Sequence, residues 1–183
     1  MVSPVLTEGA TTVTAYFPEG YWYDFWTGEL VTKSTGQSLT LQAPLDTIQV
    51  HVLGGTIIPT QEPAYTLTES RLNPFGLLVA LDENSQASGF LYLDDGDDLN
   101  SIQNNAYTTI SYQVQGGKLT GTVTSNGYAP SAALGSITVL GVNSSPSQVF
   151  VNGKSVPFTY SSNTLAVSGL SVSMTQNFAV TWD

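Results

Sequence analysis

Four aspartates crowd the segment Leu93-Asp94-Asp95-Gly96-Asp97-Asp98-Leu99, although the whole chain has only 14 acidic residues. Protein-bound Ca²⁺ takes about six to eight oxygen ligands, and neighbouring carboxylates can supply several of them. Asp94, Asp95, Asp97 and Asp98 are therefore candidate metal ligands. Ca²⁺ is the only cofactor that the sequence suggests.

The same aspartates have two other interpretations. Asp-Gly is strong turn chemistry, and aspartate side chains often accept hydrogen bonds from nearby backbone N–H groups. The spacing also differs from that of an EF-hand loop, which places acids at alternating positions before its glycine. A plain turn and a direct contact with a sugar therefore stay open beside the cation site.

Aromatic side chains concentrate between Tyr16 and Trp26, a segment that holds seven of the chain's nineteen aromatic residues. Exposed aromatic rings can stack on sugar rings, so Tyr21, Trp22 and Trp26 are candidate carbohydrate-binding residues. The alternative is that these rings fill a core or an interface, because each of them buries a large area. Alternation along a strand would divide them between the two roles.

No set of residues matches a catalytic constellation. Glycoside hydrolysis needs two carboxylates about 5–9.5 Å apart, but neither Glu19 with Asp24 nor Asp97 with Asp98 lies in a supporting motif. His51 is the only histidine, and the chain has no cysteine. A lone histidine on a strand is expected in a core or an interface. We therefore predict no catalytic residue and no enzymatic activity for this chain alone.

The charge balance excludes several kinds of partner. Only 10% of the residues are charged, the net charge is −10, and the four basic residues are Lys33, Arg71, Lys118 and Lys154. Nucleic acid and anionic membrane surfaces both require clustered cations, so neither is an expected partner. Neutral ligands such as sugars suit this composition better, because they are bound by hydroxyls, amides and aromatic rings.

The composition also favours a secreted protein. A surface rich in Ser, Thr, Asn and Gln is typical of secreted proteins, fungal ones especially, and Asn143-Ser144-Ser145 is an N-glycosylation sequon. Met1-Val2-Ser3-Pro4 has neither a basic nor an apolar region, so no signal peptide is expected there. We expect a secreted, extracellular glycoprotein with a glycan on Asn143.

The elements that must position these residues are short β-strands. β-branched and aromatic runs such as Thr11–Phe17 end at Gly, Pro or Asn turns, and no segment shows the apolar period of a helix. We predict an all-β fold made of two antiparallel β-sandwich domains in tandem. A change of composition near Gln61–Thr68, among several prolines, places the domains at residues 1–62 and 63–183.

Three turns are predicted to join neighbouring strands. Asp82-Glu83-Asn84-Ser85 is read as a hairpin turn between two apolar runs, and Gly116-Gly117 as a second hairpin. Asn152-Gly153 is a strong signal for a type I′ hairpin. The aspartates follow the short run Phe90–Leu93 and should lie where that strand ends.

Several motifs occur in an order that resembles one known family. They are Ser3-Pro4-Val5-Leu6, Val13-Thr14-Ala15-Tyr16-Phe17-Pro18, Trp22-Tyr23-Asp24-Phe25-Trp26-Thr27-Gly28, His51-Val52-Leu53-Gly54-Gly55-Thr56-Ile57-Ile58-Pro59, Thr68-Glu69-Ser70-Arg71, Leu91-Tyr92-Leu93-Asp94-Asp95-Gly96 and Ile137-Thr138-Val139-Leu140-Gly141-Val142. This order resembles the C-terminal region of glycoside hydrolase family 31, the α-glucosidases, from about Ser3 to Asp183. Each motif is weak alone, whereas their common order is specific.

The resemblance implies a domain arrangement and also that the family's catalytic residues lie outside this chain. Residues 1–62 would be the proximal and 63–183 the distal of two C-terminal β-domains that follow a catalytic (β/α)₈ barrel. The family's nucleophile lies in a Trp-Ile-Asp-Met-Asn-Glu type motif of that barrel, and this motif is absent here. Asp94-Asp95-Gly96 is then a family hallmark outside the catalytic constellation.

Three functions follow from this resemblance. The first is a non-catalytic region that braces the barrel of a retaining α-glucosidase acting on terminal α-1,4-linked glucose. The second is a stand-alone carbohydrate-binding protein, or lectin, derived from the same module. The third is a separate subunit that completes a barrel-containing partner chain. An aromatic face without its barrel would also expose an apolar patch, so a homodimer or an occupied face is expected.

Overall fold

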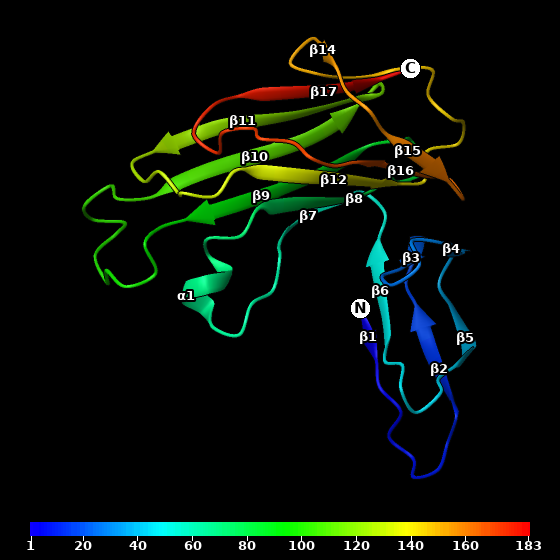
Figure 1. The fold of residues 1–183 in the computed structure, drawn as a ribbon. Helices are drawn as coiled ribbons and strands as arrows, with labels where there is room; N and C mark the ends of the chain where they lie inside the picture. The colour runs from blue at the N-terminus through cyan, green and yellow to red at the C-terminus, as the bar shows by residue number, and fades with distance from the viewer.

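The computed structural model describes all residues from Met1 to Asp183 and is built almost entirely from β-strands. It contains seventeen strands and one short helix, which confirms the predicted all-β class. The strands form a smaller N-terminal part and one large curled sheet (Figure 1). No helix combines the length and the apolar character needed to cross a membrane.

The N-terminal part, here called the first unit, contains a four-stranded sheet in the order β1-β6-β3-β4 and the separate pair β2-β5. Alternation along β2 turns Ala15 and Phe17 inward, against Trp22 of β3, and leaves Tyr16 60% exposed. The strands of this unit are β1 (Val2–Ser3), β2 (Thr12–Phe17), β3 (Gly20–Asp24), β4 (Leu30–Ser34), β5 (Gln37–Gln42) and β6 (Gln49–Leu53).

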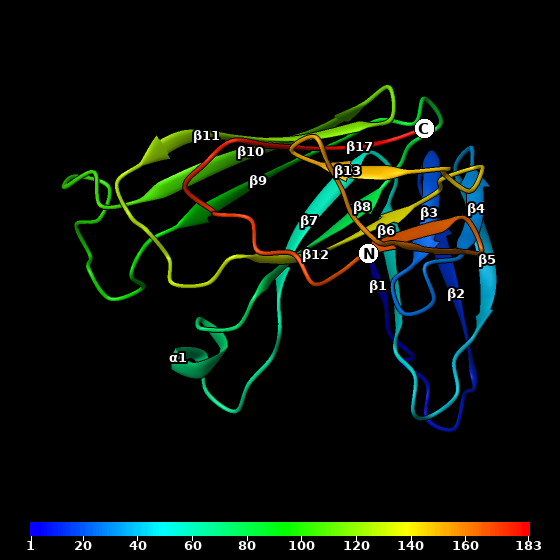
Figure 2. The same ribbon diagram turned by 45° about the horizontal axis from the view of Figure 1, so that its top comes forward.

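The large sheet has eleven strands in the order β14-β13-β17-β11-β10-β9-β7-β8-β12-β16-β15. The sheet is curled (Figure 2) and surrounds a core of 22 buried residues. Ile110, Tyr112 and Val114 of β10 are all buried in this core, as alternation along a strand requires. Its strands are β7 (Thr56–Gln61), β8 (Phe75–Ala80), β9 (Ala87–Leu93), β10 (Thr108–Gln115), β11 (Lys118–Asn126), β12 (Leu134–Leu140), β13 (Val149–Val151), β14 (Lys154–Ser155), β15 (Thr159–Ser161), β16 (Thr164–Val167) and β17 (Phe178–Trp182).

The prediction of two antiparallel sandwiches in tandem needs correction. One curled sheet dominates residues beyond the first unit, and the structure does not divide clearly into two sandwiches. The pairing is also not wholly antiparallel, because β12 runs parallel to β8 and β7 forms a parallel bridge to β9. The proposed boundary at residue 62 stays a prediction; β7, just before it, is part of the large sheet.

The predicted hairpin at Asp82-Glu83-Asn84-Ser85 is also wrong. These residues do form a turn between β8 and β9, but β7 lies between those two strands in the sheet. Ile57 of β7 pairs with Val79 of β8, so the edge that β9 would use in a hairpin is already taken. The residue types therefore predict the turn correctly, whereas the predicted pairing of β8 with β9 is wrong.

The two parts of the molecule are joined by a small buried cluster. Tyr23 and Val52 of the first unit pack against Ala80 and Leu140 of the large sheet. The Tyr23 hydroxyl donates a 2.8 Å hydrogen bond to the carbonyl oxygen of Leu81. In the turn between β6 and β7, the backbone N–H of Gly55 also donates a hydrogen bond to the carbonyl oxygen of Ala80. The first unit is therefore held against the sheet by both packing and hydrogen bonding.

The one helix, α1 (Leu67–Ser70), lies in the connection between β7 and β8 (Figure 1). Thr66 caps it by accepting a hydrogen bond from the backbone N–H of Glu69 at 3.2 Å. None of its residues is buried, so it contributes little to either core.

Candidate functional site

The aspartate cluster directly follows β9, as the sequence predicted. Asp94 Oδ1 accepts a hydrogen bond from the Gly96 N–H at 2.9 Å, and Asp98 Oδ1 accepts one from the Asn100 N–H at 2.8 Å. Asp95 Oδ1 accepts from the N–H groups of Asp98 at 2.9 Å and Asp97 at 3.0 Å. Three of the four carboxylates therefore bind neighbouring backbone groups of their own turn.

Two further carboxylate oxygens of this turn are also used locally. Asp94 Oδ2 accepts from the Ser101 hydroxyl at 3.0 Å, and Asp98 Oδ2 accepts from the Asn104 amide at 3.1 Å. The Arg71 guanidinium donates to the backbone carbonyl of Asp94. The backbone N–H groups of Asp98 and Asp97 lower the pKa of Asp95 below its ordinary value.

These contacts favour the turn over the cation site. No group of three or more His, Cys, Asp or Glu side chains is placed to hold a metal ion anywhere in the structure. The negative charges of the aspartate cluster repel one another, and the backbone N–H groups and the nearby Arg71 guanidinium offset this repulsion. A Ca²⁺ site at Asp94, Asp95, Asp97 and Asp98 finds no geometric support.

The three candidate stacking residues do not share one surface. Trp22 is only 6% exposed, packs edge-on against Phe17 at 5.7 Å between centroids, and has no free ring face for a sugar. Trp26 is 58% exposed, and its indole N–H donates to the carbonyl of Ile48 at 2.9 Å. Tyr21 is half-buried on the opposite side of β3 from Trp22. Sugar binding at Tyr21 and Trp26 stays a prediction.

His51 is a core residue, as expected for a lone histidine on a strand. It is 2% exposed, its ring meets the edge of Phe17 at 4.9 Å, and its Nδ1 atom has no hydrogen-bond partner. Burial lowers its pKa below 6.5, while the carboxylate of Asp24 on the neighbouring strand acts in the opposite direction and the N-terminal ammonium adds to the lowering. The imidazole is therefore held neutral.

This histidine should make the chain less stable in mild acid. Above about pH 6.5 both folded and unfolded states carry neutral His51, so the group has no effect there. Below that pH the unfolded chain takes up the proton more readily, and the free energy of unfolding should fall. Urea unfolding at about pH 7 and about pH 5 measures this loss. His51→Leu removes the titrating group without breaking a side-chain hydrogen bond, so the free energy of unfolding of this variant should fall less between the two pH values. An unchanged pH dependence in this variant would show that His51 is not the group responsible.

Asn143 lies on the exposed loop that follows β12. Its side chain is accessible, and glycosylation at this position stays a prediction.

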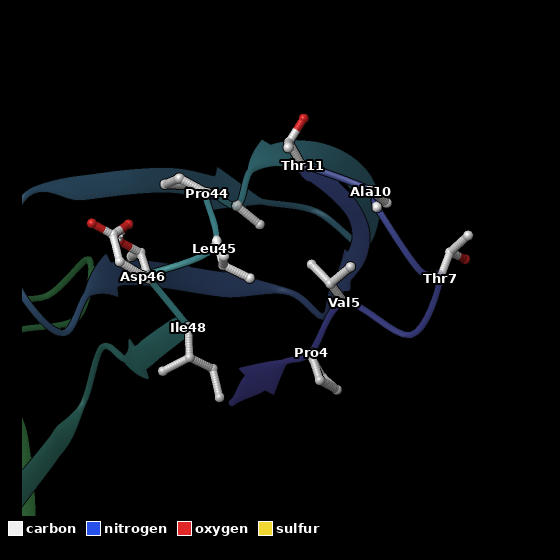
Figure 3. A pocket seen from close by; sticks show the side chains of 12 residues that line it. Pro4, Val5, Thr7, Ala10, Thr11, Pro44, Leu45, Asp46 and Ile48 are labelled. Atoms are coloured by element: carbon white, nitrogen blue, oxygen red, sulfur yellow. Dashed lines mark hydrogen bonds between the residues drawn. The ribbon is translucent and has the colours of Figure 1, made fainter.

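An open pocket of the first unit was not predicted from the sequence. It has a volume of about 740 Å³ and lies between the loop after β1 and the loop before β6 (Figure 3). Among its lining side chains, Leu45 is fully exposed, Ile48 is 50% exposed and Val5 is 38% exposed. Its lining residues are Pro4, Val5, Thr7, Gly9, Ala10, Thr11, Ala43, Pro44, Leu45, Asp46, Thr47 and Ile48.

This pocket and its exposed apolar side chains, Val5, Leu45 and Ile48, form what we call the apolar loop surface. An exposed apolar patch on the first unit was predicted, but from its aromatic residues. The patch is instead mainly aliphatic and lies on two loops that contain Pro4 and Pro44. The sequence did contain a signal for this patch, because hydrophobic residues stand next to Pro4 and Pro44 outside any alternating strand pattern.

Comparison with known sequences places this chain near the end of much larger enzymes. Residues 1–58 match the glycosyl hydrolase family 31 C-terminal domain. The whole chain aligns with lysosomal alpha-glucosidase of Rattus norvegicus at 40% identity, covering 21% of that protein. It aligns likewise with glucoamylase 1 of Schwanniomyces occidentalis at 39%, covering 20%, and with intestinal sucrase-isomaltase of Oryctolagus cuniculus at 38%, covering 10%. The chain thus spans about a tenth to a fifth of these relatives.

Solved structures share the fold over the same span. The Tris-bound glucosidase II alpha subunit superposes on the whole chain with a TM-score of 0.87 at 21% identity, and the match covers 22% of that subunit. A glucose-complexed family 31 dextranase of Flavobacterium johnsoniae gives a TM-score of 0.78 at 24% identity, covering 25% of that chain. The family match, the alignments over the whole of this chain and the order of its motifs all indicate the same family. Over its whole length, this chain corresponds to the C-terminal domain region of the glycoside hydrolase family 31 α-glucosidases.

Proposed function

We propose that the chain is a non-catalytic, barrel-bracing region of an α-glucosidase that releases terminal α-1,4-linked glucose. Its partner is the catalytic barrel, carried by the same polypeptide or by a second chain. The relatives carry this region within a longer protein, which supports the bracing role over a stand-alone lectin. The composition supports a secreted parent enzyme.

The observation that carries this proposal is the apolar loop surface. Val5, Leu45 and Ile48 expose aliphatic side chains around a single open pocket of about 740 Å³. Exposing such side chains together is unfavourable in water, and contiguous apolar patches on soluble proteins mark interaction sites. A protein surface of matching apolar character would remove all three side chains from water. The barrel of an α-glucosidase is the partner that the family relationship suggests.

The catalytic part of the proposal has a direct test. The purified 183-residue chain should release no product from maltose or from a nitrophenyl α-glucoside, because the nucleophile motif of the family's barrel is absent from its sequence. Turnover that co-purifies with the chain and survives removal of contaminants would overturn the non-catalytic role.

The apolar loop surface should cause the isolated chain to self-associate. We expect light scattering to show concentration-dependent dimers or larger species, because two copies can cover each other's apolar loops. The double substitution Leu45→Ser and Ile48→Ser should shift the population to monomers, since each of these side chains loses about 2 kcal/mol of burial on association. In the complete α-glucosidase, the same pair should lower the thermal midpoint and the activity together.

Leu99→Ser provides a matched control for this experiment. Leu99 is 94% exposed and lies in the connection between β9 and β10. This connection lies at the far left of Figure 1, away from β1. Its replacement should leave the association unchanged. A wild-type chain that stays monomeric at high concentration, or a double variant that associates as strongly as the wild type, would contradict docking through the apolar loops.

A further inference from the structure

A polar cleft lies where the first unit meets the large sheet. It consists of an inner cavity of about 100 Å³ and an outer one of about 340 Å³. Both cavities are lined by Tyr21, Lys33, Asp82 and Glu83, so they adjoin along these side chains. We call the two cavities together the interunit cleft. None of its residues lines the apolar loop surface.

Each part of the molecule contributes one wall of the interunit cleft. Tyr21 and Lys33 are cross-strand neighbours on β3 and β4, and the Lys33 ammonium lies 4.8 Å from the centroid of the Tyr21 ring. Asp82 and Glu83 come from the turn between β8 and β9. The inner cavity is completed by Asn143, after β12, and by other residues of the large sheet. A ligand in this cleft would therefore touch both parts at once.

The polar groups of the cleft include unused donors and acceptors. Asp82 employs only Oδ1 in its own turn, accepting from the N–H groups of Asn84 at 2.9 Å and Gln86 at 2.8 Å. Its second oxygen is left for another partner. Asn163 accepts a bond from the Tyr160 hydroxyl at 3.2 Å through Oδ1, which leaves its amide N–H₂ as a donor.

The backbone around the inner cavity is held in uncommon conformations. Ser85, Ser162 and Asn163 all line it and have φ values of 57°, 48° and 60°. The chain has only five non-glycine residues with positive φ, and three of them meet here. Ser162 and Asn163 are the two central residues of the hairpin between β15 and β16, as in a type I′ turn, and Ser85 lies in the turn between β8 and β9. Turns of the large sheet therefore form this wall of the cleft.

These properties define the class of ligand. Three carboxylates, from Glu19, Asp82 and Glu83, outnumber the single ammonium of Lys33, which disfavours anions. Mixed hydrogen-bond donors and acceptors match the hydroxyl groups of a neutral sugar. The outer cavity alone reaches the lower end of the range of about 300–1,000 Å³ found for small-molecule sites. We propose that the interunit cleft binds one or two neutral sugar units, with contacts from both parts of the chain.

The test uses the 183-residue chain produced in bacteria, so that Asn143 carries no glycan. Calorimetric titration with glucose, maltose and isomaltose should give binding in the millimolar range for at least one of them. Glu83→Gln and Asn143→Ala should each weaken that binding by about fivefold, the effect of losing one or two hydrogen bonds. Both residues are exposed, so neither substitution should change the thermal midpoint of the free chain.

Tyr65→Ala is the matched control, because Tyr65 is a fully exposed aromatic residue that lines neither cavity. The affinity of this variant for the sugar should equal that of the wild type. Amide chemical-shift changes on titration should map to residues 82–85, 141–143 and 162–163. The absence of binding at millimolar sugar, a loss of binding in Tyr65→Ala alone, or shifts that map elsewhere would each overturn the proposal.

Discussion

Replacing Gly89 with alanine is expected to reduce the free energy of unfolding by about 3 kcal/mol or more. Gly89 lies in β9, where that strand passes β7. An added Cβ would lie 2.3 Å from the carbonyl oxygen of Ile57 and 2.7 Å from the Ile57 Cβ atom. The oxygen belongs to the backbone and Ile57 is 3% exposed, so neither can move without disturbing the central strands. Because small proteins are stable by only about 5–15 kcal/mol, this loss is large.

Urea unfolding followed by circular dichroism measures the change at Gly89. Gly116→Ala is the control, because open space surrounds Gly116 and its φ of 57° is the only obstacle to a side chain. That variant should lose about 1–2 kcal/mol, the cost of placing an L-residue in the left-handed region. Equal effects of the two substitutions would mean that β7 and β9 do not approach as closely as described.

The second large effect is expected at Tyr23, the side chain that joins the first unit to the large sheet. Tyr23→Ala should cost about 3–5 kcal/mol, because it removes a buried aromatic ring from the cluster with Val52, Ala80 and Leu140. It also leaves the carbonyl of Leu81 without its 2.8 Å hydrogen bond. With this contact gone, the first unit should unfold before the sheet. Differential scanning calorimetry should then show two transitions where the wild type shows one.

Tyr23→Phe separates packing from hydrogen bonding at the same position. It keeps the ring and should cost only about 1–3 kcal/mol, from the unpaired Leu81 carbonyl. Burial raises the pKa of Tyr23 to about 12, so ionisation above about pH 10 favours the unfolded chain. The wild type should therefore lose stability between about pH 10 and about pH 12, and Tyr23→Phe should lose less there. A single unchanged transition in Tyr23→Ala would show that the two parts are held together by other contacts.

Local features of the fold were predictable because they depend on a few adjacent residues. Gly116-Gly117 joins β10 and β11 as a hairpin, and Asn152-Gly153 joins β13 and β14 with both residues at positive φ, as a type I′ turn requires. The aspartates follow the end of β9, and the alternative interpretation of them as a turn accounts for the contacts that they make.

Long-range pairing was not predictable in the same way. β6 and β7 are separated only by Gly54 and Gly55, yet they belong to different sheets. β7 enters between β8 and β9, and β12 pairs in parallel with β8 across more than fifty residues of sequence. An apolar strand offers the same two edges to any partner, so its own sequence does not specify which strands will occupy them.

The sequence by itself determined the strand-rich class, most of the turns and the family relationship, because each depends on residue types at short spacing or on motif order. Only the tertiary structure decided how the individual side chains are used. It buried Trp22, left Trp26 exposed, and showed that the aspartates bind their own backbone. It also brought Tyr21 and Lys33 beside Asp82 and Glu83 at the junction of the two parts. The physical reason is that burial and side-chain convergence depend on contacts between segments far apart in the chain.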